Sequence, residues 1–351
     1  MSDSSAPVYP LYNNSYTIFQ VSPLHRRDTP LNNASLLIHA VRLREILVGG
    51  VLKGIEINEN AADDAARSRA GALQAVSFRT LTEEQHWLED LAQREQHPSL
   101  PGLSDRGILI EIKYEHAEHR AIMLRDISSD GRPARDVTEF ERMPLFLARM
   151  PFSILDKVAR YLALAFDTQI QNFPLARQFV NETVDLYIRN LMGSDTNSLT
   201  MDSSKVMKAS QIIKDISITC GRPDENGELR TFDIHFKEAD IPRYIARAPK
   251  DQQGPKGTPF LYGIHQYMYD HTAVDILHHR LIWEKVACSA FVIGLEKLRF
   301  TLPTDSNQRF ASRQLLNVII ATAATHAFDN EVDDGLPEGF EEFLNSRMDE
   351  E

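Results

Sequence analysis

Pro10-Leu-Tyr-Asn-Asn-Ser-Tyr-Thr-Ile-Phe-Gln-Val-Ser-Pro-Leu24 is the first clear strand signal in this 351-residue chain. Two sets of side chains alternate along it, one being Tyr16, Ile18 and Gln20 and the other Thr17, Phe19 and Val21. This period of two, in a run rich in β-branched and aromatic residues, predicts a half-buried strand. Pro23 ends the strand and keeps the residue before it extended. Because this strand comes so early, the other strands of its sheet are expected from later parts of the chain.

The composition is that of a globular protein. Hydrophobic residues make up 42% of the chain and charged residues 25%, which is ordinary for a soluble domain. No apolar run approaches the roughly 18 residues of a membrane-spanning helix, and the first residues lack the basic start and apolar core of a signal peptide. The two cysteines, Cys220 and Cys288, are far apart in the sequence, which favours a reducing compartment. We expect an intracellular protein with one large domain or two.

Most of the negative charge lies at one end of the chain. The net charge is -12, and residues 329–351 contain ten acids against one base, Arg347. The remainder is nearly balanced, so a local basic surface for nucleic acid is compatible with the acidic pI. We expect a disordered segment over residues 1–9, one α+β domain over residues 10–328 with a seam between two lobes near residues 130–150, and an acidic tail over residues 329–351.

Strands in pairs alternate with helices along the chain. Apolar spacing and end signals predict helices over residues 35–48, 82–96, 153–166, 175–191 and 310–328. Alternating patterns predict strands over residues 73–79, 108–114, 120–127, 212–219 and 229–236. Residues 274–292 are rich in β-branched side chains and predict one long strand, with a helix as the alternative. This order predicts an α+β fold with a mainly antiparallel sheet and packed helices.

No common catalytic, nucleotide-binding or metal-binding motif occurs in the sequence. His116 and His119 lack the His-Glu-x-x-His pattern and fall where we expect a turn between two strands. Cys220 and Cys288 have no motif around them, so we expect buried, unreactive thiols. We therefore assign no catalytic, metal-binding or cofactor-binding residue and expect no cofactor. An α+β enzyme or small-molecule-binding protein with a site built from scattered residues is the alternative.

Four arginines are candidates for contact with DNA phosphates: Arg26, Arg27, Arg120 and Arg125. If they share one sheet face, DNA binding should fall steeply with salt. The simpler interpretation is a solvated surface, because aspartates and glutamates interleave with arginines between residues 126 and 141. We expect charge reversal at Arg26 and Arg27 to weaken binding to DNA or nucleosomes without unfolding the protein.

The predicted long strand over residues 274–292 is a candidate for partner binding. A long strand at the edge of a sheet invites the addition of a strand from another chain. The candidate contact residues along this strand are Val274, Ile276, Ile282 and Val286.

Three stretches in order resemble one family. They are Tyr16-Thr-Ile-Phe-Gln-Val-Ser-Pro-Leu24, Met143-Pro-Leu-Phe-Leu-Ala148 with the helix after it, and Phe232-Asp-Ile-His-Phe236. Together they resemble the centromere protein L family over residues 10 to about 328. The residues that carry the resemblance, and that we expect to define the fold, are Tyr16, Phe19, Pro23, Leu24, Pro144, Leu145, Phe146, Asp233 and Phe236. His25 stands where animal members tend to have tyrosine, so the chain resembles a fungal-type member, a subunit of the Sim4 kinetochore complex.

The resemblance implies a non-enzymatic protein of the nucleus, located at the centromere and kinetochore. Members of this family form a heterodimer with centromere protein N inside the inner-kinetochore network, and some self-associate through C-terminal strands. The partner contributes to recognition of the centromeric nucleosome, and the dimer surrounds a basic channel suited to DNA. The family fold is α+β with a strongly curved antiparallel sheet.

Overall fold

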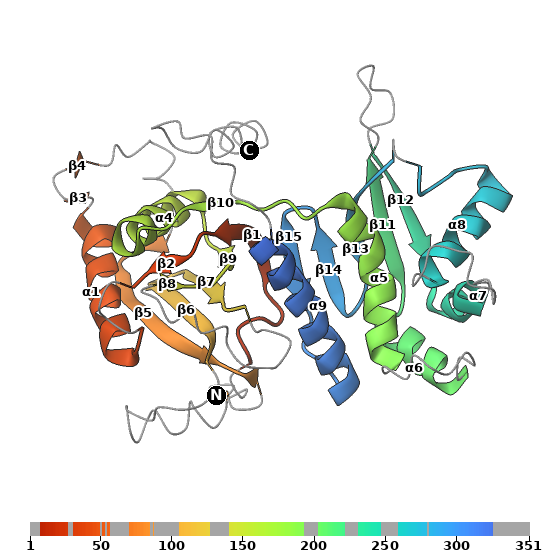
Figure 1. Cartoon of the computed structure of the whole chain (residues 1–351), viewed down its shortest axis with the longest axis horizontal. Coiled ribbons are helices and arrows are strands. Elements are labelled where there is room, and N and C mark those ends of the chain that lie inside the picture. Colours follow the sequence, from red (N-terminus) through yellow and green to blue (C-terminus); the bar gives the residue numbers. More distant parts are fainter. Residues whose placement is uncertain are drawn as a thin grey trace, which may run out of the picture. The chain divides into compact units, whose positions relative to one another are not determined.

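A computed structural model gives the fold of the chain (Figure 1). It describes residues 8–26, 31–49, 51–52, 55–56, 70–84, 87, 105–126, 140–192, 203–221, 231–246, 259–278 and 281–325. The chain divides into two compact units: the first contains residues 16–173 with 1–9 and 319–351, and the second contains residues 174–318 with 10–15. Antiparallel strands and helices occur in both, so the predicted α+β class is confirmed.

The first unit is built on an antiparallel sheet that includes the opening strand. Across the sheet the order is β1 (Ser15–Val21), β9 (Leu145–Arg149), β7 (Glu118–Leu124), β6 (Asp105–Tyr114) and β5 (Leu73–Thr82). The short strand β10 (Ile170–Asn172) also pairs with β1. Phe146 lies opposite Phe19 on one side and Met123 on the other. The opening strand thus pairs with strands from later in the chain, as its position predicts.

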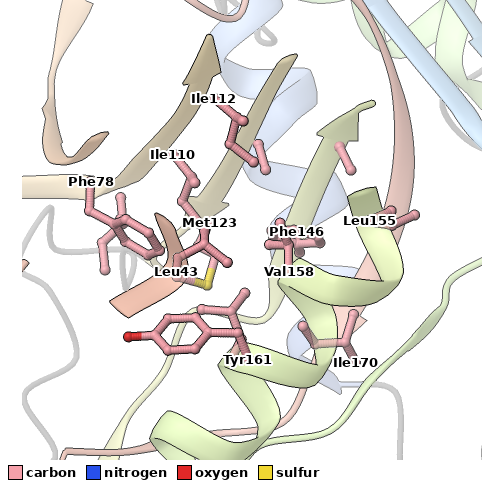
Figure 2. Packing of buried hydrophobic residues seen from close by; sticks show 14 of the residues in the cluster. Leu43, Phe78, Ile110, Ile112, Met123, Phe146, Leu155, Val158, Tyr161 and Ile170 are labelled. Carbon is pink, nitrogen blue, oxygen red and sulfur yellow. The ribbon is translucent and has the colours of Figure 1, made fainter. Parts of the chain in front are cut away.

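Helices α1 (Asn33–Gly49) and α4 (Phe152–Phe166) complete the core of the first unit. Figure 2 shows Val158 and Tyr161 of α4 packed near Phe146 and Met123 of the sheet. These side chains are fully or almost fully buried. Burying a large apolar side chain contributes about 1.5–3 kcal/mol, so this layer of helices on sheet stabilises the first unit.

The other side of the first sheet has an apolar region that meets the end of the last helix. Ile18, Leu147 and Ile122 lie side by side across three strands and are fully buried. On the same strand as Ile18, the Gln20 side-chain amide donates to the carbonyl of Ala323 (2.7 Å), near the end of α9 (Ser306–Thr325). A buried amide is tolerated when it is hydrogen-bonded, so this contact ties the end of α9 to the opening strand.

The second unit contains antiparallel strands and helices of its own. Across the sheet the order is β12 (Thr231–Phe236), β11 (Ile216–Gly221), β13 (Ile282–Ala287), β14 (Phe291–Gly294) and β15 (Lys297–Phe300). Its helices are α5 (Arg177–Met192), α6 (Ser203–Ile213), α7 (Ile241–Ala246), α8 (Pro259–Thr272) and the first part of α9. Helix α5 packs against β13 (Figure 1).

Several short elements complete the chain. They are the strand pair β2 (Leu24–His25) and β8 (Phe140–Glu141), the pair β3 (Val51–Leu52) and β4 (Ile55–Glu56), and the 3-10 helix η1 (Glu238–Asp240). The pairing of β2 with β8 matters for function, because it positions a carboxylate beside one of the candidate arginines.

The predicted long strand over residues 274–292 is wrong. Helix α8 ends at Thr272, and the Asp275 carboxylate then accepts the N–H of Leu277 (3.0 Å) in a turn before β13. A second turn separates β13 from β14, with which it pairs. Because β13 also pairs with β11, it offers no free edge along its paired residues.

The candidate partner residues of that segment are mostly inaccessible. Ile276, Ile282 and Val286 are buried, and Val274 is half-buried. The indole N–H of Trp283 donates to the carbonyl of Ile276 (3.0 Å), which fixes the turn against the core. The β-branched content of this segment reflects burial in the second core, not an exposed strand edge.

The curvature of the sheet, the seam between the two units and the two ends of the chain can also be compared with the expectations. The sheet is open and uncurled, so the strong curvature implied by the resemblance is not observed. The chain changes unit at residues 9–10, 15–16, 173–174 and 318–319, and the seam expected near residues 130–150 stays a prediction. Tyr9 is buried and donates to the carbonyl of Thr82 (2.9 Å), whereas residues 1–7 lie outside the described part. Most of the predicted helix over 82–96 and the whole acidic tail also lie outside it.

Candidate partner and nucleic-acid surfaces

Arg26 and Arg125 converge on one buried carboxylate. The pairing of β2 with β8 places Glu141 opposite Leu24, near the start of the segment that follows β2. Arg26 Nη1 lies 3.6 Å from one carboxylate oxygen of Glu141, and Arg125 forms an ion pair with the other. Glu141 is 9% exposed. Removing a partner from a buried charge is strongly destabilising, so a change of Arg26 to an acid affects the fold as well as any surface contact.

Arg120 belongs to a second ion-pair network. It lies opposite Glu111 of β6, with its Nε 3.3 Å from that carboxylate, and its Nη2 donates to Glu118 (2.8 Å). Glu111 also pairs with Arg79 of β5. Burial acts to lower the pKa of Arg120, but the hydrogen bond and charge of Glu118 and the charge of Glu111 outweigh it and raise the pKa overall. Three of the four candidate arginines thus balance carboxylates of their own unit, and Arg27 lies outside the described residues.

His116, His119, Cys220 and Cys288 form no catalytic or metal-binding site with other described residues. His116 lies in the turn between β6 and β7, as predicted, whereas His119 lies on β7, where its ring packs against Tyr114 (5.8 Å between centroids). Burial raises the pKa of Cys220 and of Cys288 to about 12, so both thiols stay protonated and unreactive at neutral pH. Among the residues that the structure describes, no three histidines, cysteines or carboxylates are grouped to hold a metal ion. None of the described helices is both long and apolar enough to cross a membrane.

The edge of the second sheet is β12. This strand ends the sheet order and pairs only with β11 in the described part of the chain. Asp233 and His235 are exposed, whereas Ile234 and Phe236 are buried. The alternation gives a solvated outer face, and Phe236 anchors the strand through edge-to-face contact with Tyr244 (5.4 Å). The family-signature segment around Asp233 and Phe236 therefore forms a sheet edge, which the sequence did not predict.

A hollow of about 790 Å³ opens in the second unit. Its walls are the end of α5, helix α6, the residue Ser289 and the segment that leads into α9. Apolar side chains such as Leu191 and Ile212 line it together with three lysines, Lys205, Lys208 and Lys214. All three lysines are exposed to solvent. The hollow thus has apolar side chains in its wall and positively charged lysines among the residues that line it.

The lining of this hollow contains three lysines and one carboxylate. Its one carboxylate, Asp305, caps α9 by accepting the N–H of Gln308 (2.7 Å). The start of a helix carries partial positive charge, which adds to that of the lysines. The lining holds no histidine or cysteine, so it lacks the convergent catalytic groups that the alternative, an enzyme, would need.

Sequence reasoning missed these lysines because it did not predict α6. The signal was present as composition: residues 203–214 contain three lysines and no acid, in a chain whose net charge is negative. Lys205 and Lys208 are three residues apart on α6, which places them on one side of the helix.

The comparisons with known proteins give one positive finding. The family model described as Centromere protein L matches residues 10–324. The match covers the described parts of both units and includes all three stretches on which the resemblance rests. No curated protein matches the chain.

Proposed function

The chain belongs to the centromere protein L family, and from this premise we propose that it is a structural subunit of the inner kinetochore that pairs with centromere protein N. Family membership gives it a kinetochore-associated role and a location at the centromere. The fungal-type resemblance supports a place in the nucleus, within the Sim4 complex and beside other inner-kinetochore proteins. In this role the pair helps to anchor the kinetochore to the centromeric nucleosome.

The observation that carries the pairing is the edge strand β12. An edge strand presents unpaired N–H and C=O groups to which another chain can add a strand. β12 is six residues long, and alternate residues along it have these groups on the side away from β11; its Ile234 and Phe236 are buried in the second unit. We therefore place the contact with centromere protein N, and any self-association, on β12 in place of the segment over 274–292.

Hydrogen exchange of the purified complex tests this contact. On addition of centromere protein N, the backbone amides of β12 should exchange at least about tenfold more slowly, because new inter-strand hydrogen bonds must open first. Strand β5 is the matched control, since it ends the sheet of the first unit and should be unaffected. Unchanged exchange in β12 despite a stable one-to-one complex would place the interface elsewhere.

The lysines of the hollow support direct contact with DNA phosphates by the same subunit. Lys208 and Lys214 are exposed, and no carboxylate in the described part of the chain forms an ion pair with either. The candidate arginines of the first unit, by contrast, are held by Glu111, Glu118 or Glu141. We propose that these lysines contribute more to phosphate binding than Arg26, Arg120 or Arg125.

Reversing both lysines, Lys208→Glu with Lys214→Glu, should weaken DNA binding by the complex and lower its salt dependence. The slope of log K against log salt falls by about 0.9 for each phosphate that the protein no longer neutralises, so a decrease of up to about 1.8 is expected. Reversal of Lys237 and Lys297, which are exposed elsewhere in the second unit, provides the control. Equal slopes in the two double variants would remove the hollow from the DNA contact.

A further inference from the structure

The hollow of the second unit contains more than a contact with phosphates requires. Lysines are sufficient to hold phosphates, and protein surfaces that bind DNA are polar and positively charged. The end of α5, helix α6 and the segment before α9 nevertheless contribute apolar side chains to the wall: Leu191, Met192, Ile212 and Leu302. Leu302 is 47% exposed. Apolar walls with a few charged groups are typical of a site for a ligand that is itself partly apolar.

Hydrogen bonds hold two of these walls in place. The last carbonyls of a helix have no partner within the helix, and at the end of α6 the N–H and the hydroxyl of Ser289 both donate to the carbonyl of Ile213 (3.0 and 2.9 Å). Before α9, the N–H of Leu302 donates to the side-chain oxygen of Asn13 (3.2 Å). The apolar walls are therefore formed before any ligand binds, as is usual for binding sites.

Charged and apolar groups lie close together in the lining. Lys208 and Ile212 are four residues apart on α6, which places them on the same side of the helix. The lysines of the lining are exposed, whereas Leu191 is buried and Ile212 half-buried. An occupant that complements this arrangement is apolar where it meets the walls and anionic where it reaches the solvent-exposed lysines.

We propose that the hollow binds an acidic peptide segment of another protein. One large apolar side chain of the segment enters between α5, α6 and Leu302, and carboxylates on either side of it pair with the lysines. The charges are complementary, because the lining has three lysines against the single carboxylate of Asp305, which already caps α9. Since all three lysines reach solvent, the charged part of the occupant lies at the surface, as the residues that flank an anchoring side chain do.

This site goes beyond the proposed contact with DNA and does not depend on it. The apolar wall has no part in holding phosphates, whereas the lysines serve both ligands. DNA and the acidic segment then compete for the hollow, and each lowers the apparent affinity of the other by the fraction of chains that it occupies. The hollow is in this way a place where an acidic partner displaces DNA from the subunit.

Binding of a synthetic peptide to the full-length chain tests the site. The probe is a fluorescent peptide with one leucine between two runs of three glutamates, and its anisotropy is followed as protein is added. We expect saturable binding. Serine in place of the leucine should weaken it at least about tenfold, which corresponds to losing the burial of one large apolar side chain. Unlabelled duplex DNA should displace the peptide.

Variants of the chain separate the apolar contact from the charge contact. Leu302→Ser leaves the charge unchanged and should weaken binding of the peptide at least about threefold, because roughly half of this side chain is open to a ligand. Phe310→Ser is the matched control, since Phe310 is 42% exposed and lies outside the lining. The double variant Lys208→Glu with Lys214→Glu should weaken binding of both the peptide and DNA.

Several results would overturn the peptide site. Absence of saturable binding, or equal binding of the leucine and serine peptides, means that the hollow recognises charge alone and leaves it to DNA. Binding that neither Leu302→Ser nor the double lysine variant weakens places the peptide elsewhere. Dimers of the wild type in sedimentation that Leu302→Ser abolishes assign the hollow to a second copy of the chain.

The competition experiment keeps this proposal separate from the contact with DNA. A peptide that needs Leu302 but is not displaced by duplex DNA would support the peptide site and contradict the contact between the lysines and DNA. Displacement by DNA of a peptide that does not need its leucine would have the opposite meaning.

Discussion

Phe146→Ala is expected to lower the free energy of unfolding by about 3–5 kcal/mol, the range for truncation of a buried aromatic residue. Phe146 is fully buried at the centre of the first sheet, opposite Phe19 on β1 and Met123 on β7. Its ring lies 6.0 Å from that of Phe19 (centroid to centroid). Truncation removes the packing of β9 against both neighbouring strands and leaves a cavity that helix α4 cannot readily fill, because its own side chains are already packed.

Urea unfolding followed by far-ultraviolet circular dichroism measures this effect. The midpoint should fall with little change in the slope, since the surface exposed on unfolding stays nearly the same. Phe140→Ala is the matched control: Phe140 is 45% exposed, so the same substitution should cost less than about 1 kcal/mol. Similar losses in the two variants would contradict the placement of Phe146 in the core.

The residues that the sequence identifies best are those whose environment is set locally. Alternation predicts the strand β1, and the structure buries its Phe19 together with Phe146 of β9 on the side that faces the helices. The same reasoning finds α1 and α4 to within two residues, because their apolar spacing and end signals lie inside the segment itself. The strand β1 is not half-buried as expected, because Tyr16 and Ile18 on its other face are as buried as Phe19; alternation identified the strand and not the covering of its second face.

The local sequence pattern fails where contacts with other residues determine whether a segment turns and which strands it pairs with. Residues 274–292 have the composition of a strand, but Asp275 captures a backbone N–H and Trp283 bonds to Ile276, so the segment turns before β13 begins. Its neighbours, β11 and β14, then cover both edges of β13. Edge status depends on which strands pair, and pairing across a sheet is invisible in the sequence of one strand.

The same limit applies to the candidate surfaces. Arg26 and Arg125 look available in the sequence, because Glu141, which pairs with both, is distant along the chain. Arg120 pairs with Glu111 of the neighbouring strand as well as with Glu118 of its own. Glu141 reaches Arg26 only because β8 pairs with β2. Conversely, the lysines line a common hollow only because α6 lies beside the start of α9. Charge composition identifies candidates, and strand pairing decides which of them are already neutralised.

At about pH 4, Asp185→Asn is expected to lower the free energy of unfolding by about 1–3 kcal/mol, the cost of a buried donor left without an acceptor. Asp185, on α5, is 2% exposed, and its two carboxylate oxygens accept the N–H groups of Phe260 and Leu261, each at 2.7 Å. These N–H groups belong to the first turn of α8, which has no acceptors of its own there. A carboxyl group offers two acceptor oxygens and an amide offers one, so the variant leaves one N–H unbonded at every pH.

The pH dependence of stability gives a second readout at the same residue. Burial raises the pKa of Asp185 to about 7, although the N–H groups of Leu261 and Phe260 and the charge of Arg189 favour the ionised form. An unfolded aspartate has a pKa of about 3.9. Between these two values the folded chain holds a proton that the unfolded chain has lost, so the contribution of Asp185 to stability falls as the pH rises through this window.

Unfolding free energies of the wild type and of Asp185→Asn, measured from pH 4 to pH 8, should therefore converge as the pH rises and then reverse in order near neutral pH, because a rise of about three in pKa corresponds to about 4 kcal/mol. The difference between the two curves isolates Asp185, because His39, whose pKa is lowered by burial and by Arg42, contributes equally to both. Asp270→Asn is the control, since Asp270 is exposed on α8 and its replacement should not change the curve. A difference between wild type and Asp185→Asn that stays constant over this range would mean that Asp185 is ionised in the folded chain near its ordinary pKa, held there by the first turn of α8.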